Sequence, residues 1–414
     1  MEGTNSHDGA GNPLAGPLAG PHAGSEGCAE TRPGATAPVA KSLSPAAPGD
    51  AIAVASDAAQ DNRNGRGAAG RTYAALDLGT NNCRLLVARP SRRGFKVVDA
   101  FSRIIRLGEG VSATGRLSEP AIERTIDALR VCAAKMDRNK VERAGLIATE
   151  ACRLACNADE FLARVRRDIG LDIKVVDGET EAKLAVSGCA SLIDLSCDFA
   201  LVFDIGGGSS ELIWLDLRQR RHGWRRSLPD RLEVQGCIAA WTSLQVGVVT
   251  LAEQFGGKLV DAEIFEAMVR HVARMLEPFE AKHGLRKRLA QGRSHLLGTS
   301  GTVTTVAGVH LRLPRYERNK VDGCWLDSQQ ARVVTADLLT SSYEERAAQP
   351  CVGKERADLV LAGCAILEAL LQTWPCQRLR VADRGLREGI LATLMTEDGV
   401  YRTGHRPAAG HWRR

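Results

Sequence analysis

Two glycine-rich turns of the same form constrain the fold of this chain more than any other feature. In each, an apolar strand ends in an aspartate (Asp77 and Asp204), glycines and small polar residues follow, and a second apolar strand begins. Glycine lets the backbone turn tightly, so that consecutive N–H groups can point at one anion. An aspartate would repel a bare phosphate, so its expected task is to hold a divalent cation or its water ligands. Two such turns facing each other would clamp a phosphate chain with a magnesium ion between them.

Three turns supply the candidate phosphate ligands. In the first two, glycine N–H groups and small polar side chains can donate hydrogen bonds to the same phosphate oxygens. The third, residues 298–302, follows an apolar segment and opens a predicted helix, and a helix N-terminus with glycines can bind an anion. A plain helix cap explains this third turn equally well. The candidate ligands are Gly79, Thr80, Asn81, Gly206, Gly207, Gly208, Ser209, Ser210, Gly298, Ser300 and Gly301.

Composition divides the 414 residues into a body and two tails. Residues 1–70 are rich in Ala, Gly and Pro, with almost no aromatic residues, so they cannot bury enough apolar surface to offset their ordering entropy. We predict a disordered tail there, a first domain over 71–197, a second domain over 198–398 and a short tail over 399–414. The sequence shows neither the basic start and apolar run of a signal peptide nor an apolar stretch long enough for a membrane span. We therefore expect no membrane partner.

Charge and cysteine content suit an anionic ligand in a reducing compartment. The formal net charge of +6 suits such a ligand, although many proteins that bind none share it. Residues 218–226 combine arginines with a tryptophan, but they follow an apolar strand and are better explained as a solvated hairpin tip than as a nucleic-acid site. Twelve cysteines occur without a CxxC pair or a zinc pattern, which favours free thiols and a cytoplasmic location.

Strands and helices alternate along the body, which indicates a mixed α/β fold. Each half begins with a strand, a glycine-rich turn and a strand, so we predict a duplicated architecture with a cleft between the halves. Predicted strands cover residues 72–78, 83–89, 95–102, 145–149, 172–176 and 378–382, with the second hairpin starting at 199. Predicted helices cover 118–137, a segment opened by Asn157, 179–193, 261–282, 301–309, 327–340, 356–373 and a final segment from 386.

Several segments together resemble the exopolyphosphatase/guanosine pentaphosphate phosphohydrolase (Ppx/GppA) family. They follow the order of that family and extend over residues 72–396; they are residues 77–81, 148–157, 178–182, 204–211, 298–302 and 385–389. The resemblance implies two ribonuclease H-like domains with a cleft between them, the fold of actin, sugar kinases and heat-shock ATPases. It also implies the short two-domain form of the family, whose final helix returns to the first domain.

The resemblance further implies hydrolysis of a terminal phosphoanhydride, with Asp77 and Asp204 holding Mg²⁺, or Mn²⁺ in its place. In this family the second glutamate of a Gly-x-x-Glu-Ala segment activates the attacking water, and that position is Glu181 here. Arg153 can bind a phosphate through both ends of its guanidinium, although a surface residue at a helix start is the alternative. Glu211 lies on the outgoing strand of the second turn and can help to hold metal or water.

Two other classes of function stay open at this point. An ATP-dependent sugar or acetate kinase of the same superfamily is disfavoured, because such a kinase would more often place an aspartate base elsewhere than at Glu181. A non-catalytic nucleotide-binding protein is disfavoured by the full set of polar residues. Polyphosphate and guanosine pentaphosphate are equally good substrates for the predicted clamp, since both present a terminal phosphoanhydride. We also expect a homodimer, and no nucleic-acid partner.

Overall fold

The computed structural model describes residues 70–400, except positions 93, 221–231, 292 and 376. The predicted disordered tail (1–70), the C-terminal tail (399–414) and much of the predicted hairpin tip (218–226) lie outside the described residues. These three interpretations therefore stay predictions.

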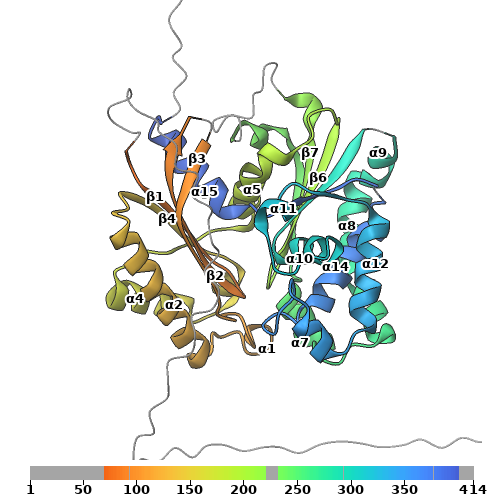
Figure 1. Ribbon diagram of the computed structural model, residues 1–414, viewed down its shortest axis with the longest axis horizontal. Coiled ribbons are helices and arrows are strands. Elements are labelled where there is room, and N and C mark those ends of the chain that lie inside the picture. Colours follow the sequence, from red (N-terminus) through yellow and green to blue (C-terminus); the bar gives the residue numbers. More distant parts are fainter. Residues whose placement is uncertain (1–69, 93, 221–231, 292, 376, 401–414) are drawn as a thin grey trace, which may run out of the picture. The chain divides into compact units, whose positions relative to one another are not determined.

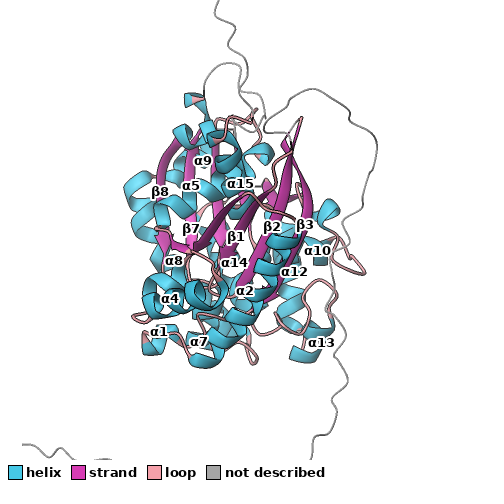
Figure 2. Ribbon diagram, turned by 90° about the vertical axis from the view of Figure 1, so that its left-hand side faces the viewer, coloured by secondary structure: helices cyan, strands magenta, loops and turns pink. Residues whose placement is uncertain are grey.

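The first half of the described chain forms a five-stranded sheet with helices on it. Its strands are β1 (Tyr73–Leu78), β2 (Asn82–Ser91), β3 (Gly94–Ile104), β4 (Arg143–Ala148) and β5 (Lys174–Val175), and its helices are α1 (Val111–Thr114), α2 (Glu119–Arg138), α3 (Glu150–Leu154), α4 (Ala158–Ile169) and α5 (Gly178–Cys189). The strand order is β3-β2-β1-β4-β5, and β2 runs antiparallel to both of its neighbours. Alternate apolar side chains of β1 and β2 pack against α2 and α4, which lie together beside the sheet (Figure 2).

The second half repeats this strand order and adds one edge strand. Its strands are β6 (Phe199–Ile205), β7 (Ser210–Asp216), β8 (Ile238–Leu244), β9 (Ser294–Thr299), β10 (Trp325–Leu326) and β11 (Leu379–Ala382). Its helices are α7 (Val248–Phe255), α8 (Ala262–His283), α9 (Leu285–Gln291), α10 (Gly301–His310), α11 (Arg318–Val321), α12 (Ser328–Thr340), α13 (Tyr343–Ala348), α14 (Val360–Thr373) and α15 (Leu386–Glu397). The order is β10-β11-β9-β6-β7-β8, so β6 and β1 hold the same place in their sheets. The predicted duplicated α/β fold is confirmed.

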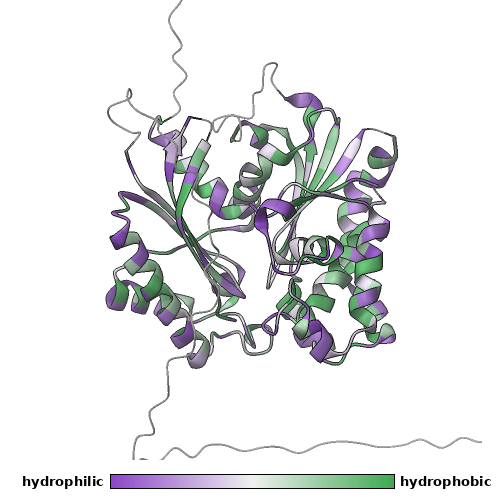
Figure 3. Ribbon diagram, viewed as in Figure 1, coloured by the Kyte–Doolittle hydropathy of each residue, from purple (hydrophilic) through white to green (hydrophobic). Residues whose placement is uncertain are grey.

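A large apolar core holds the second half together. Helices α7, α8, α10, α12 and α14 cover one face of its sheet, and α14 is buried along nearly its whole length. The central strands β6 and β7 are correspondingly apolar almost throughout (Figure 3). Because these strands are covered on both faces, they show a continuous apolar run rather than an alternating pattern.

Helices α5 and α15 each pack on the sheet of the other half of the chain. The apolar face of α5 packs on β6 and β7 of the second sheet, whereas α15 packs on β1, β2 and β4 of the first (Figure 1). The two helices lie against each other where they cross, and glycines allow the close approach. A Cβ at Gly188 would lie 1.8 Å from the carbonyl oxygen of Gly385, and a Cβ at Gly389 would lie 2.0 Å from that of Leu184. The predicted return of the chain to the first sheet is therefore made by α15.

The sequence interpretation missed several short elements, namely the strands β8 and β10 and the helices α1, α3, α7, α9, α11 and α13. The strand predicted at 172–176 is shortened to two residues in β5. None of the helices in the described residues has the length and apolar character needed to cross a membrane. Ten cysteines fall within the described residues, and all ten are free.

Candidate active site

The two glycine-rich turns meet across one pocket. Gly79, Thr80 and Asn81 line it from the first half, and residues 206–209 line it from the second. The turns lie in contact: a Cβ at Gly207 would be 2.9 Å from Thr80 Cβ, and a Cβ at Gly208 would be 2.8 Å from Thr80 Oγ1. A side chain at either glycine would therefore push the two turns apart.

Helix α7 fixes the orientation of the second turn. The Val248 N–H donates to the Gly206 carbonyl (2.9 Å), and the Val249 N–H donates to the Gly207 carbonyl (2.8 Å). In a trans peptide the C=O and the N–H point in opposite directions, so the next N–H groups, of Gly207 and Gly208, point away from α7. Both glycines line the pocket, where these groups can bind an anion.

The segment that follows β3 supports the first turn in a similar way. The N–H groups of Ile105 and Arg106 both donate to the Asn81 carbonyl, at 2.9 and 3.1 Å. The Gly108 N–H donates to the Thr80 carbonyl at 2.9 Å. Each phosphate turn therefore has its carbonyl oxygens held from outside the pocket by a neighbouring segment.

Two aspartates face the pocket from the ends of β1 and β6. Burial, followed by the nearby charges of Glu211 and Asp77, raises the pKa of Asp204 to about 7. Burial also raises the pKa of Asp77, although Arg84 opposes this change. Neither aspartate forms an ion pair with any side chain of the described residues. A cation bound beside these two carboxylates would lower both pKa values.

Glu181 faces the same pocket and is held by an arginine. It lies in the first turn of α5, whose N-terminus is capped by Asp177. Arg153 in α3 donates to Glu181 Oε2 (2.7 Å) and, through Nε, to Glu150 Oε2 (2.7 Å). Burial and the charge of Glu211 raise the pKa of Glu181 well above its usual range, against the opposing effect of Arg153.

Glu211 on β7 accepts two hydroxyl hydrogen bonds. Ser209 Oγ and Ser243 Oγ both donate to its Oε1, at 2.8 and 2.9 Å. Burial raises the pKa of Glu211, and these two hydrogen bonds lower it in part. Glu211 lines the pocket beside the second turn, as the alternation along β7 predicts.

Four residues predicted to bind phosphate lie elsewhere. Ser210 is buried, and its hydroxyl donates to the Val246 carbonyl at 2.7 Å instead of entering the pocket. Gly298 packs inside β9, where a Cβ would lie 2.6 Å from the Phe203 ring. Gly301 begins α10 outside the pocket lining, and Arg153 lines a neighbouring pocket together with Trp241. Ser300 does line the main pocket, in a backbone conformation (φ 81°) that side chains rarely adopt.

The pocket also contains charged residues that the sequence interpretation missed. Arg84 and Arg387 both line it, and Arg84 lies directly across the β1–β2 pair from Asp77. Arg84 is two residues beyond Asn82 on β2, so strand alternation places both side chains on one face. Burial lowers the pKa of Arg387, with Arg84 adding repulsion. Two neighbouring cations in one pocket are a further sign of an anionic ligand.

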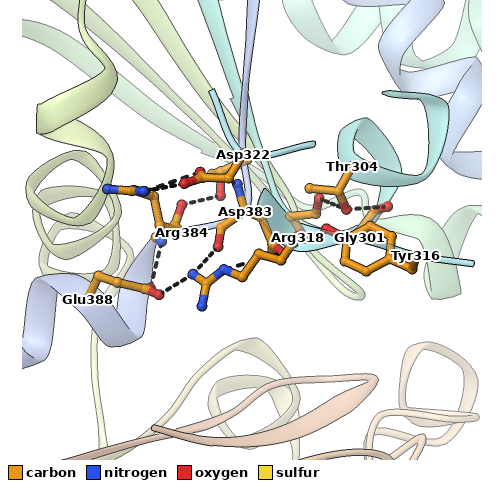
Figure 4. Close-up of polar contacts among 11 residues, drawn as sticks. Gly301, Thr304, Tyr316, Arg318, Asp322, Asp383, Arg384 and Glu388 are labelled. Carbon is orange, nitrogen blue, oxygen red and sulfur yellow. Dashed lines mark hydrogen bonds and ion pairs between the residues drawn. The ribbon is translucent and has the colours of Figure 1, made fainter. Parts of the chain in front are cut away.

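An ionic network holds the segment that carries Arg387 (Figure 4). Arg318 donates to Glu388 (2.7 Å) and to the Asp383 carbonyl, while the Tyr316 hydroxyl donates to the Asp383 carboxylate (2.7 Å). Arg384 pairs with Asp322. The network therefore ties residues 383–388 to the loop between α10 and β10 and fixes one wall of the pocket.

Sequence and structure comparisons agree with this geometry. A model of the Ppx/GppA phosphatase family matches residues 86–398. The chain belongs to this family. A protein of Haemophilus influenzae, named provisionally as an exopolyphosphatase, is 26% identical over 330 residues, covering 78% of this chain and 91% of that protein. A solved Ppx/GppA family member from Aquifex aeolicus shares 30% of its sequence with this chain at a TM-score of 0.61, covering 79% of this chain and 98% of that one.

Other members of the Ppx/GppA family are longer. A guanosine-5'-triphosphate,3'-diphosphate pyrophosphatase of Photobacterium profundum is 28% identical over 337 residues, covering 78% of this chain but 59% of its own length. This chain therefore spans less than two thirds of that relative. The family resemblance inferred from the motifs is confirmed, whereas the roles of individual pocket residues stay predictions.

Proposed function

We propose that this Ppx/GppA protein is a phosphohydrolase that releases the terminal phosphate of inorganic polyphosphate or converts guanosine pentaphosphate to the tetraphosphate. One observation carries the proposal: two glycine turns touch across a pocket that also holds Asp77, Asp204 and Glu181. The turns supply donors for a phosphate, and the carboxylates supply a cation site and a base. The two named relatives carry these same two activities in their names.

The pocket fits a magnesium ion. Mg²⁺ keeps several waters and is usually bound by one or two carboxylates together with substrate phosphates. Asp77 and Asp204 are two such carboxylates, and both line the pocket beside the glycine-rich turns. Mn²⁺ would fit the same oxygen ligands. When bound, the ion would neutralise phosphate charge, the contribution that metals make in phosphoryl transfer.

Glu181 acts as the base in the proposed reaction. It accepts a proton from a water while the water oxygen forms a bond to the terminal phosphorus, and the bridging P–O bond on the opposite side breaks. Its raised pKa makes the carboxylate a stronger base, and the Arg153 guanidinium favours its ionised form and orients it. The N–H groups of Gly207 and Gly208, together with Thr80 and Asn81 of the first turn, bind the oxygens of the phosphate that is transferred. The N–H groups of Gly79 and Gly206 are not available, because they donate to the Asn82 and Ser209 carbonyls.

The rest of the substrate extends toward the arginines. In-line attack places the leaving group opposite the water, and therefore away from Glu181. Arg84 and Arg387 line the pocket beside Asp77, whose pKa their charges lower in part. Beyond them Arg356 lies at the N-terminus of α10, where its Nη1 would be 3.9 Å from a Cβ at Gly301. A helix N-terminus and three guanidiniums suit a chain of phosphates. We further propose a cytoplasmic location, consistent with free thiols, and a homodimer.

Phosphate release in parallel assays tests this function. Purified protein is given long polyphosphate, short polyphosphate, guanosine pentaphosphate or ATP, each with and without Mg²⁺. We expect release of phosphate from polyphosphate or guanosine pentaphosphate, without any acceptor, and loss of that release in EDTA. Turnover that requires a sugar or acetate acceptor would instead identify a kinase, and no turnover with any of the four substrates would contradict the proposal.

A further inference from the structure

An ion pair joins the two halves beside the first phosphate turn. Arg106 lies between β3 and α1, and its guanidinium binds Asp358, just before α14, at both ends (Nη1–Oδ2 2.9 Å, Nη2–Oδ1 3.1 Å). Nη2 also donates to the Glu355 carbonyl at 3.3 Å. The Asp358 side chain is 16% exposed and that of Arg106 is 32% exposed, so solvent screens the pair only in part.

Arg106 is tied directly to the first phosphate turn. Its own N–H donates to the Asn81 carbonyl at 3.1 Å, and its backbone adopts a left-handed conformation (φ 48°). That conformation is unfavourable for a residue with a side chain. It allows one residue to support Asn81 with its N–H and to reach the other half with its guanidinium.

The other end of the ion pair is tied to Arg356, near the N-terminus of α10. Asp358 is two residues from Arg356, whose carbonyl accepts from the Leu359 and Val360 N–H groups at the start of α14. The backbone of Asp358 also lies close to the end of α7, since a Cβ at Gly257 would lie 2.3 Å from the Asp358 carbonyl oxygen. A displacement of Asp358 would therefore move both Arg356 and the helix that orients the second turn.

A second contact crosses between the halves at the same place. The Gly110 N–H, at the start of α1, donates to Glu253 Oε1 on α7 at 2.8 Å. Figure 1 shows α1 and α7 close together at the lower end of the molecule, whereas α5 and α15 meet higher up. Besides the contact between the two turns, the halves are thus joined by crossing helices at one place and by polar side chains at another.

We propose that Arg106 and Asp358 are a positioning pair, which sets the spacing between the first phosphate turn and Arg356 at the N-terminus of α10. The pair does not touch the reacting atoms. It determines whether a phosphate chain can contact both walls at once, so it acts on substrate affinity more than on the chemical step. This inference rests on the proposed function, because it assumes that a phosphate chain spans the pocket.

A double-mutant cycle tests the pair. Arg106→Gln and Asp358→Asn should each raise KM for polyphosphate by about tenfold, with kcat changed by less than about threefold. The double mutant should resemble either single mutant, because both changes remove the same interaction. Arg106→Lys keeps the charge but loses the two-ended geometry, and its KM should fall between the wild-type and Arg106→Gln values. Arg130→Gln, which removes an exposed pair with Asp127 on α2, is the matched control and should leave KM unchanged.

A binding measurement separates this inference from the proposed function. Calorimetry with long polyphosphate, in the Glu181→Gln background, should show weaker binding when Arg106→Gln is added. Unchanged KM and unchanged binding in the Arg106 and Asp358 variants would overturn the inference while leaving the function intact. Additive losses in the double mutant, or a fall in kcat and melting temperature with KM unchanged, would also overturn it. If wild-type protein neither binds nor hydrolyses polyphosphate or guanosine pentaphosphate, the function itself is wrong.

Discussion

Glu181 and Glu179 lie in the same helical turn but in different surroundings. Glu181 faces the pocket and pairs with Arg153, whereas Glu179 is exposed and pairs with Lys183 one turn along α5. We expect Glu181→Gln to lower kcat by roughly 10²–10⁴, the usual effect of losing a general base, with substrate binding largely kept. Glu179→Gln, the matched control, should retain nearly full kcat. Steady-state kinetics on both variants checks this, and a Glu181→Gln variant with more than about a tenth of wild-type kcat would rule out Glu181 as the base.

At the scale of residues, the sequence identified much of the pocket but assigned too many turn residues to it. Strand alternation explains why Ser210 is outside the pocket. Ser210 follows Ser209 and therefore points to the opposite face, where its hydroxyl donates a hydrogen bond to the Val246 carbonyl. Gly298 is a glycine because the Phe203 ring leaves no room for a side chain. Arg84 could have been found by the same alternation rule, and Arg387 by its place in the segment 385–389 that was already singled out. Arg356 could not, since its place depends on how α10 and α14 pack.

At the scale of elements, α7 supports the second phosphate turn, and Gly247 at the start of α7 is the residue that contacts this turn. A Cβ at Gly247 would lie 2.4 Å from the Gly207 carbonyl carbon, which is backbone and cannot rotate away. We expect Gly247→Ala to shift the second turn, lower kcat/KM at least tenfold and cost about 1–3 kcal/mol of unfolding free energy, as overpacking typically does. Gly236→Ala, where a Cβ would meet open space, should change neither. Equal activity in the two variants, by kinetics and denaturant unfolding, would show that α7 does not support the turn.

Helices and strands were predicted correctly where an apolar periodicity extends over many residues. They were missed where tertiary contacts determine the local structure. Helix α2 has apolar residues at helical spacing over five turns, and its start at Glu119 matches the prediction within one residue. Helix α7 has eight residues and no side-chain N-cap hydrogen bond, so little in its sequence distinguishes it from a loop. Its stability comes from packing on α8 and α14 and from its contact with the second turn.

At the scale of the whole molecule, a buried histidine links stability to pH. His295 in β9 is fully buried, edge-on to Trp325, with Asp194, Arg378 and Arg380 as its charged neighbours. Burial lowers its pKa to about 4, from about 6.5 in the unfolded chain. The unfolded state therefore binds an extra proton between pH 6.5 and 4, so its contribution to stability is complete above pH 6.5 and falls by about 1.4 kcal/mol per pH unit below it.

His295→Gln should remove this dependence. Urea unfolding at several pH values from 7 to 4 should give a shallower decline for the variant than for the wild-type protein. Asp99, whose pKa is about 2 because hydrogen bonds from Lys135 and Arg138 outweigh the effect of burial, would contribute below this range and serves as an internal reference. Identical slopes for the two proteins between pH 6.5 and 4 would mean that His295 titrates alike in the folded and unfolded states.

Both chain connections between the halves pass through the α5–α15 crossing. A rotation of one half relative to the other would therefore have its axis at this crossing. A Cβ at Gly385 would lie 4.0 Å from Asp204 Oδ2, so Asp204, where we propose a metal ion, lies close to this crossing. Rotation displaces points in proportion to their distance from the axis, so Asp204 would hardly move while α1 and α7 would swing through the widest arc. A ligand bound near the crossing acts at a short distance from this axis, whereas the Arg106–Asp358 pair acts at a long distance from it. A single partly exposed ion pair can therefore control the width of the cleft. Stronger contacts with phosphate near the crossing could not close the cleft alone.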